Sequence, residues 1–407
     1  MHESLEISSA QAEEKEGLRR TVRLHKTGTT GDGDRSFFFD LIGDTSPPVP
    51  QVLDGFVFGI IFIAMQLGRP VRVHGRLSRS AIFNLAEFQS AWACWRPEKY
   101  RRVDILPDEI VDLPATQQPP RAISAFSGGV DGTFTAIRHA SKHMGNASYP
   151  LTDVMLVHGF DVPLGKPEAF NLLLQRIRPL VDELGLGMKV IRTNLKEASG
   201  QYWEDSFGVQ LAACLHNYSH DFNYALMGSG EPYSNIFYPW GSTPATDHLM
   251  SGDQMQLVLD GCAYTRTEKL ETLRSYPTAL KTLKVCWEGG NQERNCGVCE
   301  KCTRTKLNLL AVGVSDAPCF DEELDPEQIL KIRLINDVQL SELQTVYSYA
   351  QKRKIEGLWV DNLKTRIDWY VNRHNKKSLV ERLFRKLSRT EVALAMSKPA
   401  RKSRLYN

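Results

Sequence analysis

The sequence predicts an α/β fold built on a doubly wound, mostly parallel sheet, with an N-terminal α/β domain and a C-terminal helical region. Strand-like and helix-like segments alternate from residue 121 onward, which is the pattern of such a sheet. An apolar segment, 122–126, also runs into a glycine turn that opens a helical pattern. With 42% hydrophobic and 24% charged residues, the chain has the composition of a globular protein and not of a disordered one.

The alternating segments place several polar residues at one edge of the predicted sheet. We expect strands at 122–126, 154–158, 188–193 and 224–227, and helices at 133–143, 168–184 and 207–218. Ligands of doubly wound sheets bind beyond the carboxyl ends of the strands. The residues expected to converge there are Ser127, His158 to Asp161, Thr193 and Gly228 to Glu231.

The glycine turn has the chemistry of an anion site. Its glycines let the backbone approach a phosphate, and the N–H groups of the following helix point toward the bound oxygens. Ser127 adds a hydroxyl donor, and Asp131 can hold a Mg²⁺ that accompanies a nucleotide. An ordinary strand-to-helix turn is the alternative. The predicted catalytic residues are Ser127 and Asp131, and the predicted nucleotide-binding residues are Ser127, Gly128, Gly129, Val130, Asp131, Gly132, Thr133, Gly228 and Ser229.

A cysteine cluster follows about 150 residues later. Cys286, Cys296, Cys299 and Cys302 are spaced as C-x9-C-x2-C-x2-C, which suits four thiolates around one tetrahedral Zn²⁺. An iron–sulfur cluster is the rival, and four unrelated buried cysteines are the least favoured alternative. A metal cluster of this kind, with no export signal in the sequence, predicts a reducing, cytoplasmic location.

The segment Ser127-Gly128-Gly129-Val130-Asp131 resembles the signature of the PP-loop ATP pyrophosphatase superfamily, whose fold is adenine nucleotide alpha hydrolase-like. Members usually have serine where this chain has Gly132. Together with the cysteines, Thr303-Arg304 and Tyr238-Pro239, the segment from about 120 to 313 resembles the 7-cyano-7-deazaguanine synthase family. The resemblance implies ATP with Mg²⁺, a zinc site and a carboxylate substrate, 7-carboxy-7-deazaguanine, which is adenylated, amidated and dehydrated to a nitrile.

Two other functions stay open at this point. One is a PP-loop tRNA sulfur transferase, in which the cysteines hold an iron–sulfur cluster. The other is a nucleotide-binding module with little catalysis. Gly132 keeps this alternative open, because it lacks the hydroxyl group of the serine usual at this position. The added flanking segments are similar to those of family members found in anti-phage defence gene clusters.

The flanks divide the rest of the chain. We expect a loose tail at 1–20, a small α/β domain at 21–112, a linker at 113–120, the PP-loop domain at 121–313 and a basic helical region at 314–407. Asp325-Pro326-Glu327 and Ser341-x-x-Gln344 read as helix starts. The longest apolar run, 56–65, is too short for a bilayer, so no membrane is expected.

Positive charge is concentrated at the C-terminal end. Residues 351–407 carry sixteen Lys or Arg against five Asp or Glu. Such a segment is either a solvated helix face or a docking surface for nucleic acid or an acidic partner. We therefore predict a macromolecular amine as a possible acceptor of the activated carboxylate. The number of assembled chains stays open, and an oligomer is compatible with the sequence.

Overall fold

The computed structural model describes residues 4–27, 34–44, 47–114, 119–236, 238–286, 288 and 294–373. The chain divides into two compact units, 1–324 and 325–407. No helix among the described residues is long and apolar enough to cross a membrane.

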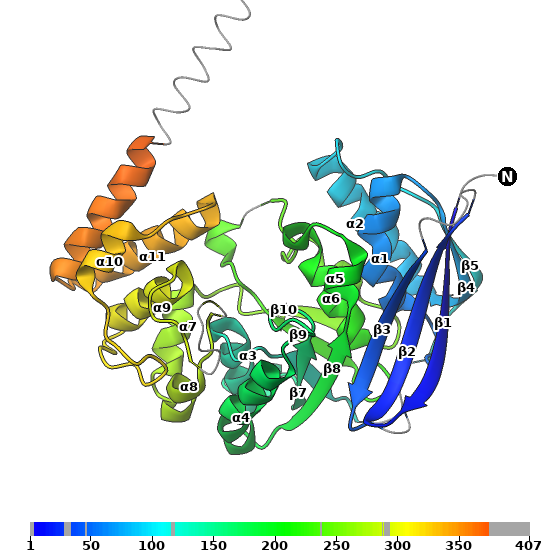
Figure 1. Ribbon diagram of the computed structural model, residues 1–407, viewed down its shortest axis with the longest axis horizontal. Coiled ribbons are helices and arrows are strands. Elements are labelled where there is room, and N and C mark those ends of the chain that lie inside the picture. The colour runs from blue at the N-terminus through cyan, green and yellow to red at the C-terminus, as the bar shows by residue number, and fades with distance from the viewer. Residues whose placement is uncertain are drawn as a thin grey trace, which may run out of the picture. The chain divides into compact units, whose positions relative to one another are not determined.

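The first unit is organised around one sheet of ten described strands, in the order β10-β9-β6-β7-β8-β3-β2-β1-β4-β5 (Figure 1). The pairs β1–β2, β2–β3 and β3–β8 are antiparallel, and the other described pairs are parallel. The predicted α/β class with a mostly parallel sheet is therefore confirmed.

The parallel half of the sheet has the strand order of a doubly wound fold. It consists of β6 (Ala122–Ala125), β7 (Leu151–His158), β8 (Gly187–Thr193), β9 (Tyr224–Gly228) and β10 (Gln256–Asp260). The chain moves outward from β6 through β7 to β8, then crosses to the other side of β6 and continues through β9 to β10. The winding direction thus reverses between β6 and β9. Such a reversal leaves a crevice at the carboxyl ends of the two strands.

The strands of this half are buried on both faces because helices cover both faces of it. Met155 and Ile191 belong to a core shared with α1 (Asp54–Leu67) and α6 (Trp203–His216). The neighbouring residues Val154 and Leu156 are also buried, although strand alternation turns them to the opposite face. There α3 (Val130–Ala140) and α4 (Pro167–Glu183) pack on the strands.

The other half of the sheet contains the N-terminal strands. They are β1 (Leu5–Glu14), β2 (Gly17–Lys26), β3 (Arg35–Ile42), β4 (Val71–Ser78) and β5 (Ile105–Val111). The helix α2 (Arg79–Trp95) follows β4, and its Phe88 and Trp92 join Phe62 of α1 in the core. These aromatic side chains of α2 therefore contribute to packing.

The prediction of a loose tail at residues 1–20 is wrong. The segment forms β1 and the start of β2, and β1 pairs with β2 on one side and β4 on the other. Only the beginning of β1 reaches the core, through Leu5 and Ile7, while its second half is largely exposed. That polar second half is why the sequence reads as a tail.

Residues 21–112 do not form a separate sheet. Strand β3 pairs with β8, so the N-terminal strands and the doubly wound strands belong to one continuous sheet. The prolines at 113–120 predict a linker between two domains. Residues 115–118 of that segment lie outside the described part. Those prolines connect two parts of a single unit.

Asp40 joins the two halves of the sheet. Its carboxylate is nearly buried, and it accepts from Arg19 Nε of β2 at 2.6 Å and from Arg192 Nε of β8 at 2.9 Å. One side chain of β3 thereby bridges the strands on both sides of it.

The remaining described helices of the first unit are short. They are α5 (Leu195–Ser199), α7 (Arg266–Leu273), α8 (Pro277–Thr282) and α9 (Glu300–Ala311).

The second unit is helical in its described part. It contains α10 (Pro326–Lys331), α11 (Asp337–Lys352) and a helical segment at 358–373. Asp325 caps α10 by accepting from Glu327 N at 2.9 Å, as predicted. The prediction of a helix start at Ser341 is wrong, because α11 begins earlier. Its N-cap is Asn336, whose side chain accepts from Gln339 N at 3.0 Å. The basic residues after 373 lie outside the described part.

We predict that Asp40→Ala lowers the apparent free energy of unfolding by about 2 kcal/mol, because it leaves two arginines without their buried partner. Asp112→Ala is the matched control: Asp112 pairs with Arg79 at an exposed position, where a salt bridge contributes less than about 1 kcal/mol. Urea denaturation followed by tryptophan fluorescence measures both. Equal effects of the two substitutions would contradict a joining role for Asp40.

Candidate functional site

The predicted phosphate turn lies at the reversal point of the sheet. Ser127, Gly128 and Gly129 connect the carboxyl end of β6 to α3. Gly128 has φ of +78°, which favours glycine, and its carbonyl accepts from Lys284 N at 2.9 Å. Gly129 is the N-cap of α3, with an extended backbone and no side-chain cap. The helix therefore opens directly from the turn.

The first turn of α3 supplies donors for an anion. The leading N–H groups of any helix have no acceptor within the helix, and they form the positive end of its dipole. Val130, Asp131 and Gly132 provide these groups here, while Thr133 N already donates to Gly129 O at 3.0 Å. This arrangement can bind a phosphate or a carboxylate.

Two of the predicted nucleotide-binding glycines lie where backbone segments pack closely. A Cβ atom on Gly228, at the end of β9, would lie 2.6 Å from the carbonyl oxygen of Asp131. A Cβ atom on Gly132 would lie 3.2 Å from the carbonyl oxygen of Ala125. Gly228 thus lets β9 press against the first turn of α3, and the serine usual at position 132 in the resembled family would have to displace its neighbours by a few tenths of an ångström.

Asp131 binds two cations of α7. Its Oδ2 accepts from Arg266 Nη2 at 2.7 Å, and its Oδ1 accepts from Lys269 Nζ at 2.9 Å. Burial acts to raise the pKa of Asp131, but the charges of Arg266 and Lys269 outweigh it and hold that pKa below the usual carboxyl range. The carboxylate is thus ionised, and it fixes the start of α3 to α7.

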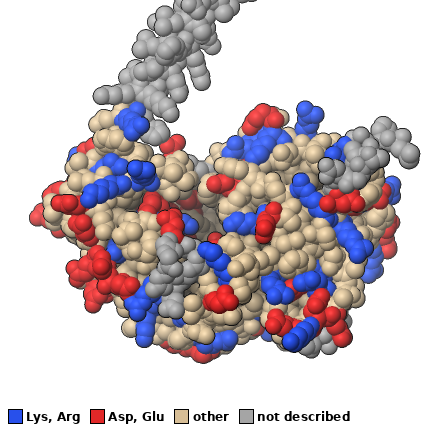
Figure 2. Space-filling view, viewed as in Figure 1, with Lys and Arg blue, Asp and Glu red and all other residues tan. Residues whose placement is uncertain are grey.

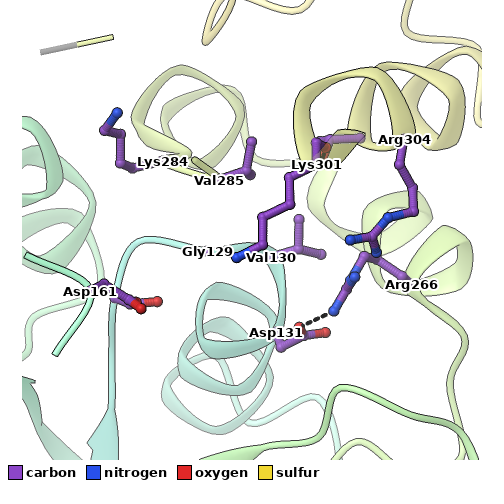
Figure 3. A pocket seen from close by; sticks show the side chains of 11 residues that line it. Gly129, Val130, Asp131, Asp161, Arg266, Lys284, Val285, Lys301 and Arg304 are labelled. Carbon is purple, nitrogen blue, oxygen red and sulfur yellow. Dashed lines mark hydrogen bonds and ion pairs between the residues drawn. The ribbon is translucent and has the colours of Figure 1, made fainter. Parts of the chain in front are cut away.

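Basic side chains surround a cavity of about 160 Å³ over the turn. Figure 3 shows Lys301 and Arg304 of α9 extending toward the turn, with Arg266 beside Asp131. Asp161, which follows β7, lies on the other side of the cavity. The lining residues are Ser127, Gly129, Val130, Asp131, Asp161, Arg266, Lys284, Val285, Lys301, Arg304 and Thr305. Four of these residues are cations and two are carboxylates. Arg266 pairs with Asp131, Arg304 pairs with Glu300 at 2.6 Å, and Lys284 Nζ donates to Cys286 O and Arg294 O at 2.7 Å. The remaining excess of positive charge favours an anionic ligand.

The four predicted metal ligands come together. The sulfur atoms of Cys286, Cys296, Cys299 and Cys302 all lie within 4.8 Å of one another. The Cys296 and Cys302 sulfurs are 3.8 Å apart, and the Cys286 and Cys302 sulfurs are 3.2 Å apart, against an edge of about 3.8 Å for a tetrahedron with Zn–S bonds of about 2.3 Å. The cluster can hold a metal ion such as zinc. Four protein ligands would close the coordination sphere, as in structural zinc sites.

The cysteines are chain neighbours of several residues that line the cavity. Cys302 lies in the first turn of α9, one residue after Lys301 and two before Arg304. Cys286 ends the segment that contacts Gly128 through Lys284 N. Buried Asn295 secures this segment: its Oδ1 accepts from Val285 N at 2.8 Å, and its Nδ2 donates to Leu283 O at 3.0 Å. A metal ion here would hold basic residues over the turn.

Other predicted residues do not all reach the cavity. His158 Nε2 contacts Pro163 O at 3.1 Å, and its ring stacks on Phe170, so the packing of His158 is local. Thr193 accepts from Leu195 N at 3.1 Å at the start of α5. Ser229 contributes its backbone carbonyl to Lys269 and donates its hydroxyl to Glu231 O at 2.9 Å.

The sequence patterns do not predict most of the cations that line or adjoin the cavity. Arg266, Lys269, Lys284 and Lys301 belong to no pattern that we predicted as part of the site, and Arg304 was noted only for the family resemblance. A usable signal for two of them is Thr265-x-x-Glu268, a capping box that opens α7 and puts Arg266 and Lys269 one turn apart.

No protein-family model matches the chain, and neither a curated protein nor a solved structure matches it.

We predict that Gly228→Ala weakens binding of inorganic pyrophosphate at least about tenfold, because its methyl group displaces the first turn of α3. Gly230→Ala is the matched control, since a Cβ atom on Gly230 meets nothing within 4 Å. Isothermal titration calorimetry measures both affinities. Unchanged affinity for pyrophosphate in Gly228→Ala would contradict a role of the first turn of α3 in binding the anion.

We expect purified protein to contain about one zinc ion per chain, and Cys302→Ser to lose most of it. Elemental analysis by mass spectrometry measures the metal. The control is Cys94→Ser, because Cys94 is exposed and lies outside the cluster. If the purified protein is brown and contains iron, the cluster holds iron and sulfide instead of zinc.

Proposed function

We propose that this chain is an ATP-dependent enzyme that activates a carboxylate by adenylation and releases pyrophosphate. One observation carries the proposal: a cavity lined by four cations lies over a Ser-Gly-Gly turn at the reversal point of a doubly wound sheet. The resemblance of residues 127–131 to the PP-loop signature supports ATP as the ligand. The resemblance to 7-cyano-7-deazaguanine synthases supports 7-carboxy-7-deazaguanine as the carboxylate.

The residues of the cavity suit the leaving group of this reaction. When the substrate carboxylate attacks the α-phosphorus, negative charge develops on the departing pyrophosphate. The N–H groups at the start of α3 and the side chains of Lys301 and Arg304 offer preorganised positive charge for it. An amine then displaces AMP from the acyl-adenylate, giving an amide.

Asp131 suits a positioning role. Both of its oxygens accept from cations, so it holds Arg266 at the edge of the cavity. Asp161 is the other carboxylate of the cavity, and it makes no salt bridge within the described part of the chain. Where Mg²⁺ accompanies the nucleotide, it supplies further positive charge to the phosphates, and Asp161 is the carboxylate better placed to bind it.

The acceptor amine can be ammonia or an amine on a larger partner. On the face seen in Figure 2, acidic and basic side chains are interspersed, without a broad field of one sign. Ten of the sixteen basic residues of the C-terminal segment lie beyond residue 373, outside the described part. The proposed docking of an acidic macromolecule therefore rests on the sequence of that segment.

We predict that the protein converts ATP to AMP and pyrophosphate in the presence of 7-carboxy-7-deazaguanine. Asp131→Ala should slow this about 100-fold or more, because Arg266 and Lys269 lose the group that orients them. Lys301→Ala should act in the same direction, whereas Lys331→Ala, an exposed lysine of α10, is the control. Chromatography of the nucleotides measures the products. Formation of ADP and phosphate would contradict adenylation, and binding of ATP without turnover would favour a nucleotide-binding module.

A further inference from the structure

Glu231 has a buried carboxylate oxygen that the site described so far does not use. It lies three residues beyond the end of β9, and no donor within the described part of the chain reaches its Oε2, which is inaccessible to solvent. Leaving such an oxygen without a hydrogen bond is costly. A buried orphan acceptor of this kind is satisfied by a bound water, ion or ligand that supplies the missing donor.

A small cavity adjoins Glu231. Its volume of about 10 Å³ is close to the space that a single water-sized molecule needs. Ser229, Glu231, Trp240, Ser242, Thr243 and Leu259 are among the residues that line it. An ammonium group has this size and donates hydrogen bonds in all directions.

The cavity lies next to the cation-lined site. Ser229, which lines it, accepts through its carbonyl from Lys269, the residue that also binds Asp131. Burial raises the pKa of Glu231 above its ordinary range, although nearby cations oppose the rise. A carboxylate of raised pKa is a better proton acceptor than an exposed one.

We propose that Glu231 and this cavity bind the ammonium head group of the acceptor amine and that the Glu231 carboxylate takes its proton. This inference rests on the proposed adenylation. The same head-group chemistry belongs to free ammonium and to a primary amine on a larger molecule.

The step balances without a further reactant. Ammonium gives one proton to Glu231, and the nitrogen lone pair that is freed attacks the carbonyl carbon of the acyl-adenylate. The bond between that carbon and the phosphate oxygen breaks, and AMP leaves with the electron pair. The new amide nitrogen still carries one extra proton, which the departing AMP phosphate takes, so the products are the neutral amide and AMP.

The test separates activation from amine transfer in the full-length protein. Carboxylate-dependent exchange of pyrophosphate into ATP reports adenylation, and amide formation with ammonium chloride reports transfer. Glu231→Gln should slow amide formation about 100-fold while exchange stays within about twofold. Glu183→Gln, at an exposed position of α4, is the matched control and should leave both unchanged.

Two further arms sharpen the test. Hydroxylamine is largely unprotonated at neutral pH and should form hydroxamate with Glu231→Gln at nearly the natural rate. Leu259→Phe should fill the cavity and raise the KM for ammonium at least about tenfold without changing exchange. Glycinamide in place of ammonium shows whether the head group is accepted from a larger amine.

The outcomes that would overturn the inference are distinct. Amide formation at the natural rate in Glu231→Gln, or an equal loss of exchange and transfer, would exclude Glu231 as the proton acceptor. No exchange in the unaltered protein would instead overturn the proposed function, and this inference with it.

Discussion

The ion pairs of Asp131 connect the parts of the site. Asp131 lies in the first turn of α3 and binds Arg266 and Lys269 of α7. Helix α7 is joined in turn to α9, because Thr267 Oγ1 donates to Asn308 Oδ1 at 2.6 Å. The glycine turn at residues 127–129, α7 and α9 therefore form one connected structure. A change in the charge of Asp131 would disturb the whole lining of the cavity, because an uncompensated cation at a buried position is costly.

A second support comes from the cysteine cluster. It brings Cys286, on the segment that contacts Gly128, to the first turn of α9. Lysine and arginine side chains repel one another when they converge, so the basic residues near the turn need a rigid scaffold. Four thiolates around a metal ion would provide that scaffold, and Asn295 adds neutral hydrogen bonds to the same segment. A metal ion bound by the cluster would therefore help to hold Lys301 and Arg304 in place.

The N-terminal strands extend the same sheet and so stiffen the site from a distance. Asp40 bridges β2, β3 and β8. Strand β8 pairs with β7, which pairs with β6, the strand that leads into the glycine turn. A sheet shared in this way cannot shift one half without straining the hydrogen bonds of the other. The N-terminal segment is therefore part of the scaffold.

The sequence by itself determined the alternation of strands and helices, the turn from Ser127 to Gly129, and the four cysteines. These features are local: they depend on hydrophobic periodicity, on the conformational freedom of glycine and on ligand spacing. Three things were decided only by tertiary structure. The polar strand β1 is ordered by its two neighbours, Gly228 is required by the approach of β9 to α3, and Arg266, Lys284 and Arg304 reach one cavity from separate elements. The physical reason is common to all three, because pairing, close packing and charge convergence depend on residues far apart in the chain, whose proximity no local pattern encodes.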